Sequence, residues 1–422
     1  MNINKLSYTW CKIGVSALAL SGLYSIVLVI LRSPGISNLI VNKDFFKTAL
    51  VVHVDLSVLV WMLSGSVIIW IKHIANIDMQ NMIFTISKVA FSGILLMVIS
   101  PCTSSEVLAI LNNYVPMLDN FWFALGISIF ASSILIISMI SLPNKGSIIF
   151  LSTTACLILS YQKLQHEIVY PMDLHGFYEM LFWSPGHSLQ FIYMHTMHQA
   201  LILSLCTKLN FPKINMIAEL INLFMALLIL PVHFLYTIDS AEFINFCTEH
   251  MKYCGGIAAG AILISIICEL LYSVSKWRFM VIASIILFAC GGFIGLLISG
   301  VNVTIPAHYH GSVVGISIAI MCLVYFLLEI RNNLLWQAKI QIIIYSLGQM
   351  LHIAGLTWSG GYGVLRKDPS TALSIKAKVA MGVMGVGGLM AIIGGLMFVV
   401  ICIRNIIHNK KQNKEREKSA II

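Results

Sequence analysis

The sequence predicts an all-α polytopic membrane protein, a bundle of twelve transmembrane helices. Hydrophobic residues make up 59% of the 422 residues and charged residues only 10%, whereas about a quarter of the residues in a soluble domain are charged. Apolar runs long enough to cross a bilayer, about 20 residues each, recur along the whole chain. The mean hydropathy of +0.91 agrees with this pattern. The composition therefore excludes a soluble enzyme carried on a single anchor.

Charges, prolines and glycines separate the apolar runs into twelve candidate spans. The first span is too long for the core of a signal peptide, and no clear small-residue cleavage site follows it, so we expect it to be retained. The fifth span is short, and the sixth is long enough to protrude beyond the lipid on one side. The spans are expected at residues 13–31, 48–71, 82–101, 121–142, 147–161, 177–207, 214–237, 252–275, 278–299, 304–330, 338–358 and 378–404.

Positive charge favours an arrangement with both termini in the cytoplasm. In that arrangement the inner loops and the termini carry sixteen Lys and Arg residues and the outer loops carry nine, in line with the retention of positive residues on the cytoplasmic side. We therefore expect a multi-pass protein of the inner (plasma) membrane. Residues 1–404 are expected to form one transmembrane domain, and residues 405–422 a basic cytoplasmic tail. Because the net charge of +9 lies largely in loops and in this tail, it requires no nucleic-acid partner.

Two histidines stand at the start of the tenth span, in the segment IPAHYHG that ends at Gly311. His308 and His310 are two positions apart, so on a regular helix they point about 200° away from each other. They cannot share one metal ion, but each can bind a different planar cofactor on opposite flanks of the helix. Ionisable side chains are expensive to place inside a membrane and therefore indicate a functional site. The alternative is a polar helix end that faces headgroup water.

Three further histidines are expected at the same depth in the membrane. His53 lies a few residues into the second span, His187 about ten residues into the sixth, and His233 near the end of the seventh. In the predicted topology all of them fall in the outer part of the membrane, and histidines with unrelated structural roles would not be expected to agree in depth. Facing histidines in a helix bundle are typical of haem and metal sites, because imidazole binds both haem iron and copper.

With these histidines in place, the chain resembles subunit I of the haem–copper oxidase superfamily. The resemblance implies two haems, with His53 and His310 as the axial ligands of a low-spin haem and His308 as the single axial ligand of a high-spin haem. It also implies that His187 and His233 bind a copper ion facing the high-spin iron. The resemblance covers about residues 44–366 and rests on the twelve spans and on the segments KTALVVHVDLSVLVWML, PMLDNFW, WSPGHSLQF, LPVHFLYT and IPAHYHGSVVGI.

Two departures from the family pattern concern the copper side. The family has two adjacent histidines in the seventh span, whereas Phe234 follows His233 here, which leaves two protein ligands for copper instead of three. In the sixth span, Leu189 and Phe191 replace the glutamate and the redox-active tyrosine of the best-known branch. Other branches keep that tyrosine on the seventh span, so Tyr236 is the candidate catalytic tyrosine.

Other polar residues could serve the same chemistry or have ordinary structural roles. His195 and His198 lie on the same helical stripe as His187. They could extend a polar path inward, or they could be hydrogen-bonded in the core. Lys88 and Glu269 are candidates for acid–base chemistry. Alternatively, each extends its charged end toward water along apolar surface, or pairs with an opposite charge. No role is expected for Glu249, His250 and Lys252. His352 could contact a haem propionate or lie at the membrane interface. Arg366 and Lys367 could bind haem propionates or be solvated loop charges.

The implied function is a haem-dependent membrane oxidoreductase that passes electrons from the low-spin to the high-spin haem to reduce O₂ in aerobic respiration. The chain has no CxxCH motif and no appended donor domain, so electrons must come from other oxidase-type subunits, a cytochrome or a quinol.

Three alternatives stay open. A divergent haem-binding protein without turnover, such as a sensor or an electron carrier, is favoured by the missing ligand at Phe234. A nitric oxide reductase-like enzyme would need a carboxylate one turn after His187 to bind a non-haem iron, but Phe191 stands there. A transporter with coincidental histidines would need a matched pair of broken helices near the midplane.

Overall fold

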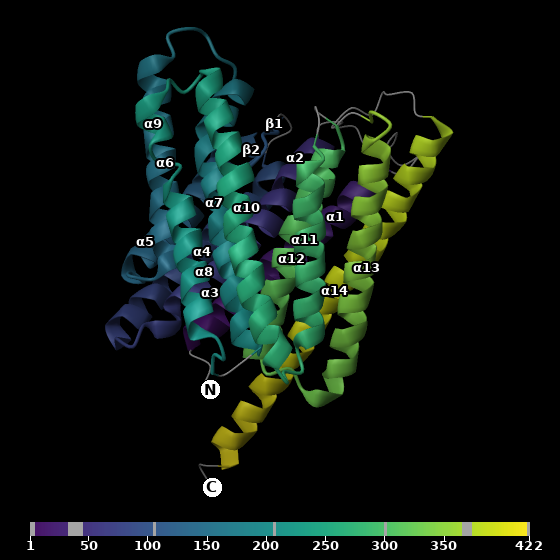
Figure 1. Cartoon of the computed structure of the whole chain (residues 1–422). Coiled ribbons are helices and arrows are strands. Elements are labelled where there is room, and N and C mark those ends of the chain that lie inside the picture. The colour runs from purple at the N-terminus through teal and green to yellow at the C-terminus, as the bar shows by residue number, and fades with distance from the viewer. Residues whose placement is uncertain are drawn as a thin grey trace. The chain divides into compact units, whose positions relative to one another are not determined.

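The computed structural model describes residues 5–32, 45–103, 107–205, 208–298, 302–364 and 374–419, and within them each predicted span is helical over most of its length (Figure 1). The predicted polytopic helical bundle is therefore confirmed. The helices are α1 (Lys5–Arg32), α2 (Phe45–Val54), a π-helix (Asp55–Val60), α3 (Trp61–Trp70), α4 (Ile77–Ile99), α5 (Phe121–Ile140), α6 (Lys145–Glu167), α7 (Leu174–Leu205), α8 (Pro212–Leu227), α9 (Val232–Leu235), α10 (Ala241–Tyr272), α11 (Arg278–Leu296), α12 (Thr304–Leu327), α13 (Asn332–Gly360) and α14 (Ile375–Ser419).

Eleven helical segments of the described chain are long and apolar enough to cross a membrane, and the protein is a multi-pass membrane protein. Helix α7, the sixth predicted span, is not among these eleven, because its polar side chains lower its hydropathy. It tolerates His187, His195 and His198 because residues 184–189 and 191–198 are all buried within the protein. The fifth span, expected to be short, is a helix of 23 residues. Helix α14 continues past residue 404 to Ser419, and a separate cytoplasmic tail stays a prediction.

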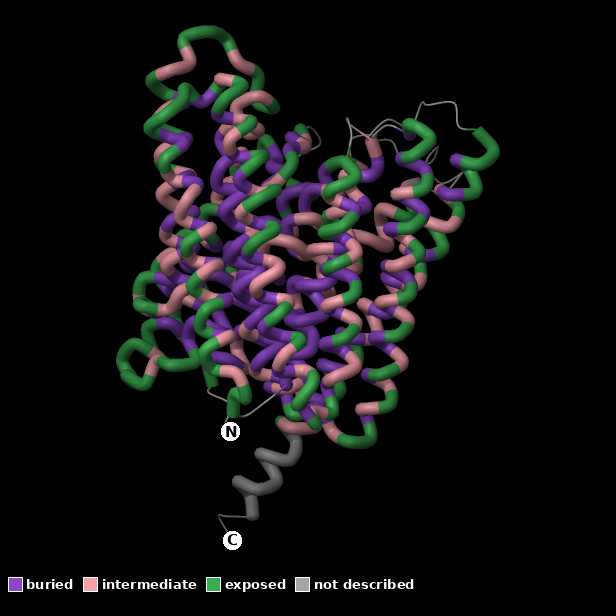
Figure 2. The backbone as a smooth tube through the Cα atoms, viewed as in Figure 1, coloured by how far each residue is buried: buried purple, intermediate pink, exposed green. Residues whose placement is uncertain are grey.

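The chain divides into two compact units, here called unit A and unit B. Unit A comprises residues 2–202 and 207–272, and unit B is made chiefly of residues 203–206 and 273–422. In unit A, α7 is bonded to the surrounding helices through hydroxyl, imidazole and amide groups. These bonds join Thr196 to Ser66 of α3, Ser188 to Thr153 of α6, and His198 to Ser265 of α10. Helix α7 is therefore the central element of unit A, and Figure 2 shows the buried positions along the chain.

A short hairpin precedes α5 in unit A. Strand β1 (Leu108–Ile110) pairs antiparallel with β2 (Met117–Asp119), with Ala109 opposite Leu118. In the connecting loop, the Asn112 Oδ1 atom accepts hydrogen bonds from the backbone N–H of Tyr114 (2.9 Å) and Val115 (2.8 Å). An asparagine side chain that bonds the backbone two residues on closes a tight turn. The hairpin was not predicted, and its turn positions Tyr114.

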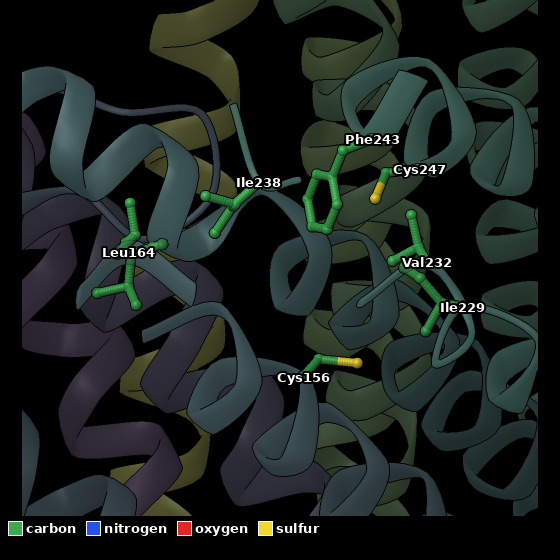
Figure 3. Close-up of a cluster of buried hydrophobic side chains, with 8 residues drawn as sticks. Cys156, Leu164, Ile229, Val232, Ile238, Phe243 and Cys247 are labelled. Carbon is green, nitrogen blue, oxygen red and sulfur yellow. The ribbon is translucent and has the colours of Figure 1, made fainter. Parts of the chain in front are cut away.

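A buried apolar cluster packs around α9 in unit A (Figure 3). Helix α6 contributes Cys156 and Leu164, and α10 contributes Phe243 and Cys247. The predicted seventh span is interrupted between α8 and α9 at Pro231, which has no backbone N–H to continue a helix. The break leaves α9 as a single turn whose Val232 belongs to the cluster. The remaining members of the cluster are Leu181, Ile229 and Ile238.

In unit B, α11 and α12 cross at two glycines. A Cβ atom on Gly291 would lie 2.1 Å from the Ser312 nitrogen, and one on Gly311 would lie 2.5 Å from the Gly291 Cα. Any larger side chain at either position would push the helices apart, and small residues at such crossings are common in membranes. The close approach brings the carbonyl of Gly291 next to His308. Helices α13 and α14 pack against each other in the same unit.

Candidate functional site

His53 is oriented by α1. Its Nδ1 atom lies 2.9 Å from the carbonyl oxygen of Ser21, which can only accept, so Nδ1 carries the proton and donates. The Ser21 hydroxyl returns a bond to the carbonyl of His53 at 3.0 Å. In a neutral imidazole the other nitrogen, Nε2, then carries the lone pair.

A π-helix begins two residues after His53. It covers Asp55–Val60, and such single-turn widenings are frequent at functional sites. The Asp55 side chain is 1% exposed, and its Oδ2 atom has no hydrogen-bond partner among the described residues. An unpaired buried carboxyl group inside a membrane helix is a functional candidate. Sequence reasoning missed it, although Asp55 is an acid within the second predicted span.

His187 lies on α7 and is bonded through both ring nitrogens. Its Nδ1 atom is 2.6 Å from the carbonyl oxygen of Trp183, one turn earlier, so Nδ1 donates. Its Nε2 atom is 2.8 Å from the hydroxyl of Tyr114. Since Nε2 bears the lone pair, the Tyr114 O–H is the donor. The hairpin loop therefore brings a tyrosine to His187 that sequence reasoning did not identify.

His233 is buried on α9, and its Nε2 atom lies 3.0 Å from the Ser184 hydroxyl. Its Nδ1 atom is buried and has no partner among the described residues. The next residue, Phe234, is 77% exposed and so does not share the environment of His233. Tyr236 follows the end of α9, is 37% exposed, and packs near Phe246 at a ring distance of 6.4 Å. Its catalytic role stays a prediction.

In unit B, α12 carries His308 and His310. The His308 Nδ1 atom donates to the carbonyl of Gly291 at 2.7 Å, which leaves its Nε2 with the lone pair. The ring of His310 meets His352 of α13 edge to face, with centroids 4.7 Å apart. His352 in turn donates from Nδ1 to the carbonyl of Met384 at 3.0 Å. His352 is thus part of the surroundings of His310, while Arg366 and Lys367 lie outside the described residues.

The other polar candidates have structural partners. Glu269 accepts bonds from the Asn210 and Phe211 backbone and from the Asn210 and Asn215 side chains, at 2.8–3.1 Å. Lys88 is exposed beside Phe84. His250, for which no role was expected, is buried against Phe191 and bonded to the carbonyl of Met225 at 2.8 Å.

The inward histidines differ in their bonding. His198 bonds to Ser265 at 2.9 Å through Nε2, whereas its Nδ1 has no partner among the described residues. Both ring nitrogens of the buried His195 lack a partner within the same part of the chain.

The histidine environments fit haem better than copper. His53 and His308 share one arrangement, with Nδ1–H held by a backbone carbonyl of another helix and Nε2 left with the lone pair. This is the usual way in which a protein orients an axial imidazole. On the copper side, the His187 lone pair is already engaged by Tyr114. Among the described residues, no group of three or more His, Cys, Asp or Glu side chains is arranged to hold a metal ion. The residues present therefore do not fit the copper site.

Comparison with solved structures supports the fold. The chain superposes on a haem–copper terminal oxidase, solved as a dimer by cryo-electron microscopy, with a TM-score of 0.70. The match covers 95% of this chain and 84% of the oxidase chain at 14% sequence identity. The fold of the protein is thus the fold of that oxidase, as the sequence motifs had predicted.

Sequence comparison places the chain among bacterial proteins. No family model matches the sequence. An uncharacterized protein of Aquifex aeolicus (strain VF5) is 25% identical over 76% of this chain and 84% of its own length. The uncharacterized protein RP382 of Rickettsia prowazekii (strain Madrid E) is 34% identical, and the alignment covers 98% of each chain. The protein therefore belongs to the family of RP382.

Proposed function

We propose that the protein is the haem-bearing subunit of a terminal-oxidase-type membrane oxidoreductase. The observation that carries the proposal is the shared arrangement of His53 and His308, two membrane histidines with Nδ1–H anchored and Nε2 left with the lone pair. The fold comparison supports it. The family resemblance pairs His53 with His310 on a low-spin haem and gives His308 to a high-spin haem. Bound haem supplies reversible one-electron iron chemistry and, at an open axial position, a place for a diatomic ligand.

The residues of the chain have distinct tasks in this proposal. Ser21 and Gly291 hold the tautomers of His53 and His308, which leaves the lone pair on Nε2; these two histidines would hold haem iron through that atom. His308 and His310 stand two positions apart on one helix, and α12 would thereby join the two haems for electron transfer. The substrate is O₂, and electrons come from other oxidase-type subunits, a cytochrome or a quinol. Residues 1–404 would form the haem-binding domain in the inner (plasma) membrane, with both termini and the basic tail in the cytoplasm.

The test is the haem content of the purified full-length protein. Two haems per chain are expected, of which one changes its reduced spectrum when CO is added. His53→Ala should remove the low-spin spectrum, and His308→Ala should remove the CO-sensitive one. His166→Ala serves as the control, because His166 is exposed on α6, and should leave both unchanged. A purified wild-type protein without haem would overturn the proposal.

A second function, a haem-binding protein without turnover, is favoured by one observation. The residues expected to bind copper provide too few ligands. The His187 lone pair accepts a hydrogen bond from Tyr114, and Phe234, which stands where the family has a further histidine, is exposed. O₂ consumption with an artificial electron donor separates the two. A haem-loaded protein that binds CO and consumes no O₂ would be a sensor or an electron carrier, whereas sustained consumption would support the oxidase.

A further inference from the structure

The bond between Tyr114 and His187 occupies the atom that a metal ion would need. Nδ1 of His187 donates to the Trp183 carbonyl at 2.6 Å, so the lone pair of the ring lies on Nε2. That lone pair accepts the Tyr114 O–H at 2.8 Å. A metal ion binds histidine through the same lone pair. The phenol and a metal ion therefore compete for one atom.

The position of Tyr114 is built into the fold. A Cβ atom on Gly186 would lie 2.2 Å from the Tyr114 Cγ atom, so the ring can rest there only because residue 186 is glycine. Trp183 meets the same ring edge-on, with centroids 5.8 Å apart. The Asn112 turn fixes the backbone of Tyr114. Three independent contacts thus hold the phenol against His187.

The second histidine expected on the copper side is also engaged. His233 is buried, and its Nε2 lies 3.0 Å from the hydroxyl of Ser184, one helical turn before His187. Its free nitrogen, Nδ1, is buried. Ring contact with Phe243 of the apolar cluster, at 5.3 Å between centroids, fixes the imidazole further. Neither histidine offers a metal the arrangement seen at His53 and His308.

We propose that the Tyr114–His187 pair replaces copper in this protein, and that the chain binds haem without a copper ion. This inference rests on the proposed function for the presence of haem, but it concerns different residues. His187 acts as the acceptor that holds the phenol, and Tyr114 keeps its proton at Oη. The pair would then present a hydrogen-bonded phenol and imidazole in place of the copper ligand expected at His187.

The experiment measures haem and copper per chain in protein produced with added copper. Wild-type protein should contain haem and less than a tenth of a copper ion per chain. Tyr114→Phe removes the hydroxyl and exposes the His187 lone pair, so its copper content should rise several-fold. Tyr161→Phe is the matched control, because Tyr161 is exposed on α6, and it should leave the copper content at the wild-type level.

Haem content tests the proposed function and copper content tests this inference, so each can fail without the other. One copper ion per wild-type chain, lost in His187→Ala, would overturn the inference even with both haems present. Copper that stays low in Tyr114→Phe would contradict the claim that the phenol excludes it. Should Tyr114→Phe fold poorly, the wild-type phenol band in ultraviolet resonance Raman spectra gives a second readout. It should shift in His187→Ala, and an unchanged band would count against the pair.

Discussion

Trp70 of α3 and His195 of α7 meet over Gly146 of α6. A Cβ atom placed on Gly146 would lie 2.4 Å from the Trp70 Nε1 atom and 3.0 Å from the His195 Nε2 atom. Both nitrogens therefore border the space that this Cβ atom would fill, and neither has a hydrogen-bond partner among the described residues. A pocket of about 310 Å³, which Trp70 and Asn144 help to line, adjoins this point. The missing side chain of Gly146 thus keeps space between two buried polar groups.

Filling that space should destabilise the protein. Gly146→Ala forces the new methyl group against both rings, and overpacking of this kind typically costs about 1–3 kcal/mol. Gly260→Ala on α10 is the control, because a Cβ atom there would meet nothing within 4 Å. Thermal unfolding of the detergent-solubilised protein should show a lower midpoint for Gly146→Ala and no decrease for Gly260→Ala. Equal midpoints for the two variants would show that the space does not matter.

Asp55 should matter for turnover more than for folding. Asp55→Asn keeps the size of the side chain and removes a carboxyl group that is buried without a partner on Oδ2. Because a buried acid in a membrane helix typically carries protons, we expect O₂ turnover to fall at least tenfold with haem content unchanged. Asp78→Asn, at an exposed position of α4, should have wild-type turnover. Full activity in Asp55→Asn would remove Asp55 from the functional residues.

Glu269 should contribute to stability through its four accepted hydrogen bonds. They join α10 to the segment before α8 and to α8 itself. Glu269→Gln replaces one of the two acceptor oxygens with an NH₂ group. This group donates hydrogen bonds, so it cannot accept those that Asn210, Phe211 and Asn215 donate to Glu269. Hydrogen bonds to a charged group contribute about 1.5–3 kcal/mol, so the unfolding midpoint should fall by several degrees. Glu249→Gln, exposed on the same helix, should leave it unchanged, and a similar midpoint for both variants would contradict this role.

His352 should tune the haem that His310 is proposed to bind. Its ring meets His310 edge to face, and Met384 fixes its orientation. His352→Ala removes this contact, so the low-spin absorbance band should shift or weaken while the CO-sensitive spectrum stays constant. His352→Phe keeps an aromatic ring at the position and should restore the band at least in part. A change confined to the CO-sensitive spectrum would place His352 with the other haem.

The helices could be predicted from the sequence because each is an apolar run bounded by charges, prolines or glycines. The break before α9 was not predicted, because residues 214–237 were expected to form one span. Pro231 is nevertheless visible in the sequence and could have indicated it. The close approach of Gly311 to the backbone of Gly291 joins two different helices, and no pattern within one span indicates it.

The surroundings of the histidines could not be predicted, because they depend on residues far away in the sequence. Ser21 orients His53 across 32 positions, and Tyr114 reaches His187 across 73. No local periodicity encodes such contacts. Asp55 is different, since an acid inside an apolar run is visible in the sequence and could have been identified as a candidate.

The polarity of α7 has a consequence for how the protein enters the membrane. A helix that falls short of the hydropathy of its neighbours partitions poorly into lipid when it leaves the translocon alone. Its Thr196, Ser188 and His198 side chains bond to α3, α6 and α10, and α10 is synthesised later. Stable integration of α7 must therefore wait for at least one helix that follows it, which makes biogenesis of unit A a cooperative event rather than a helix-by-helix one.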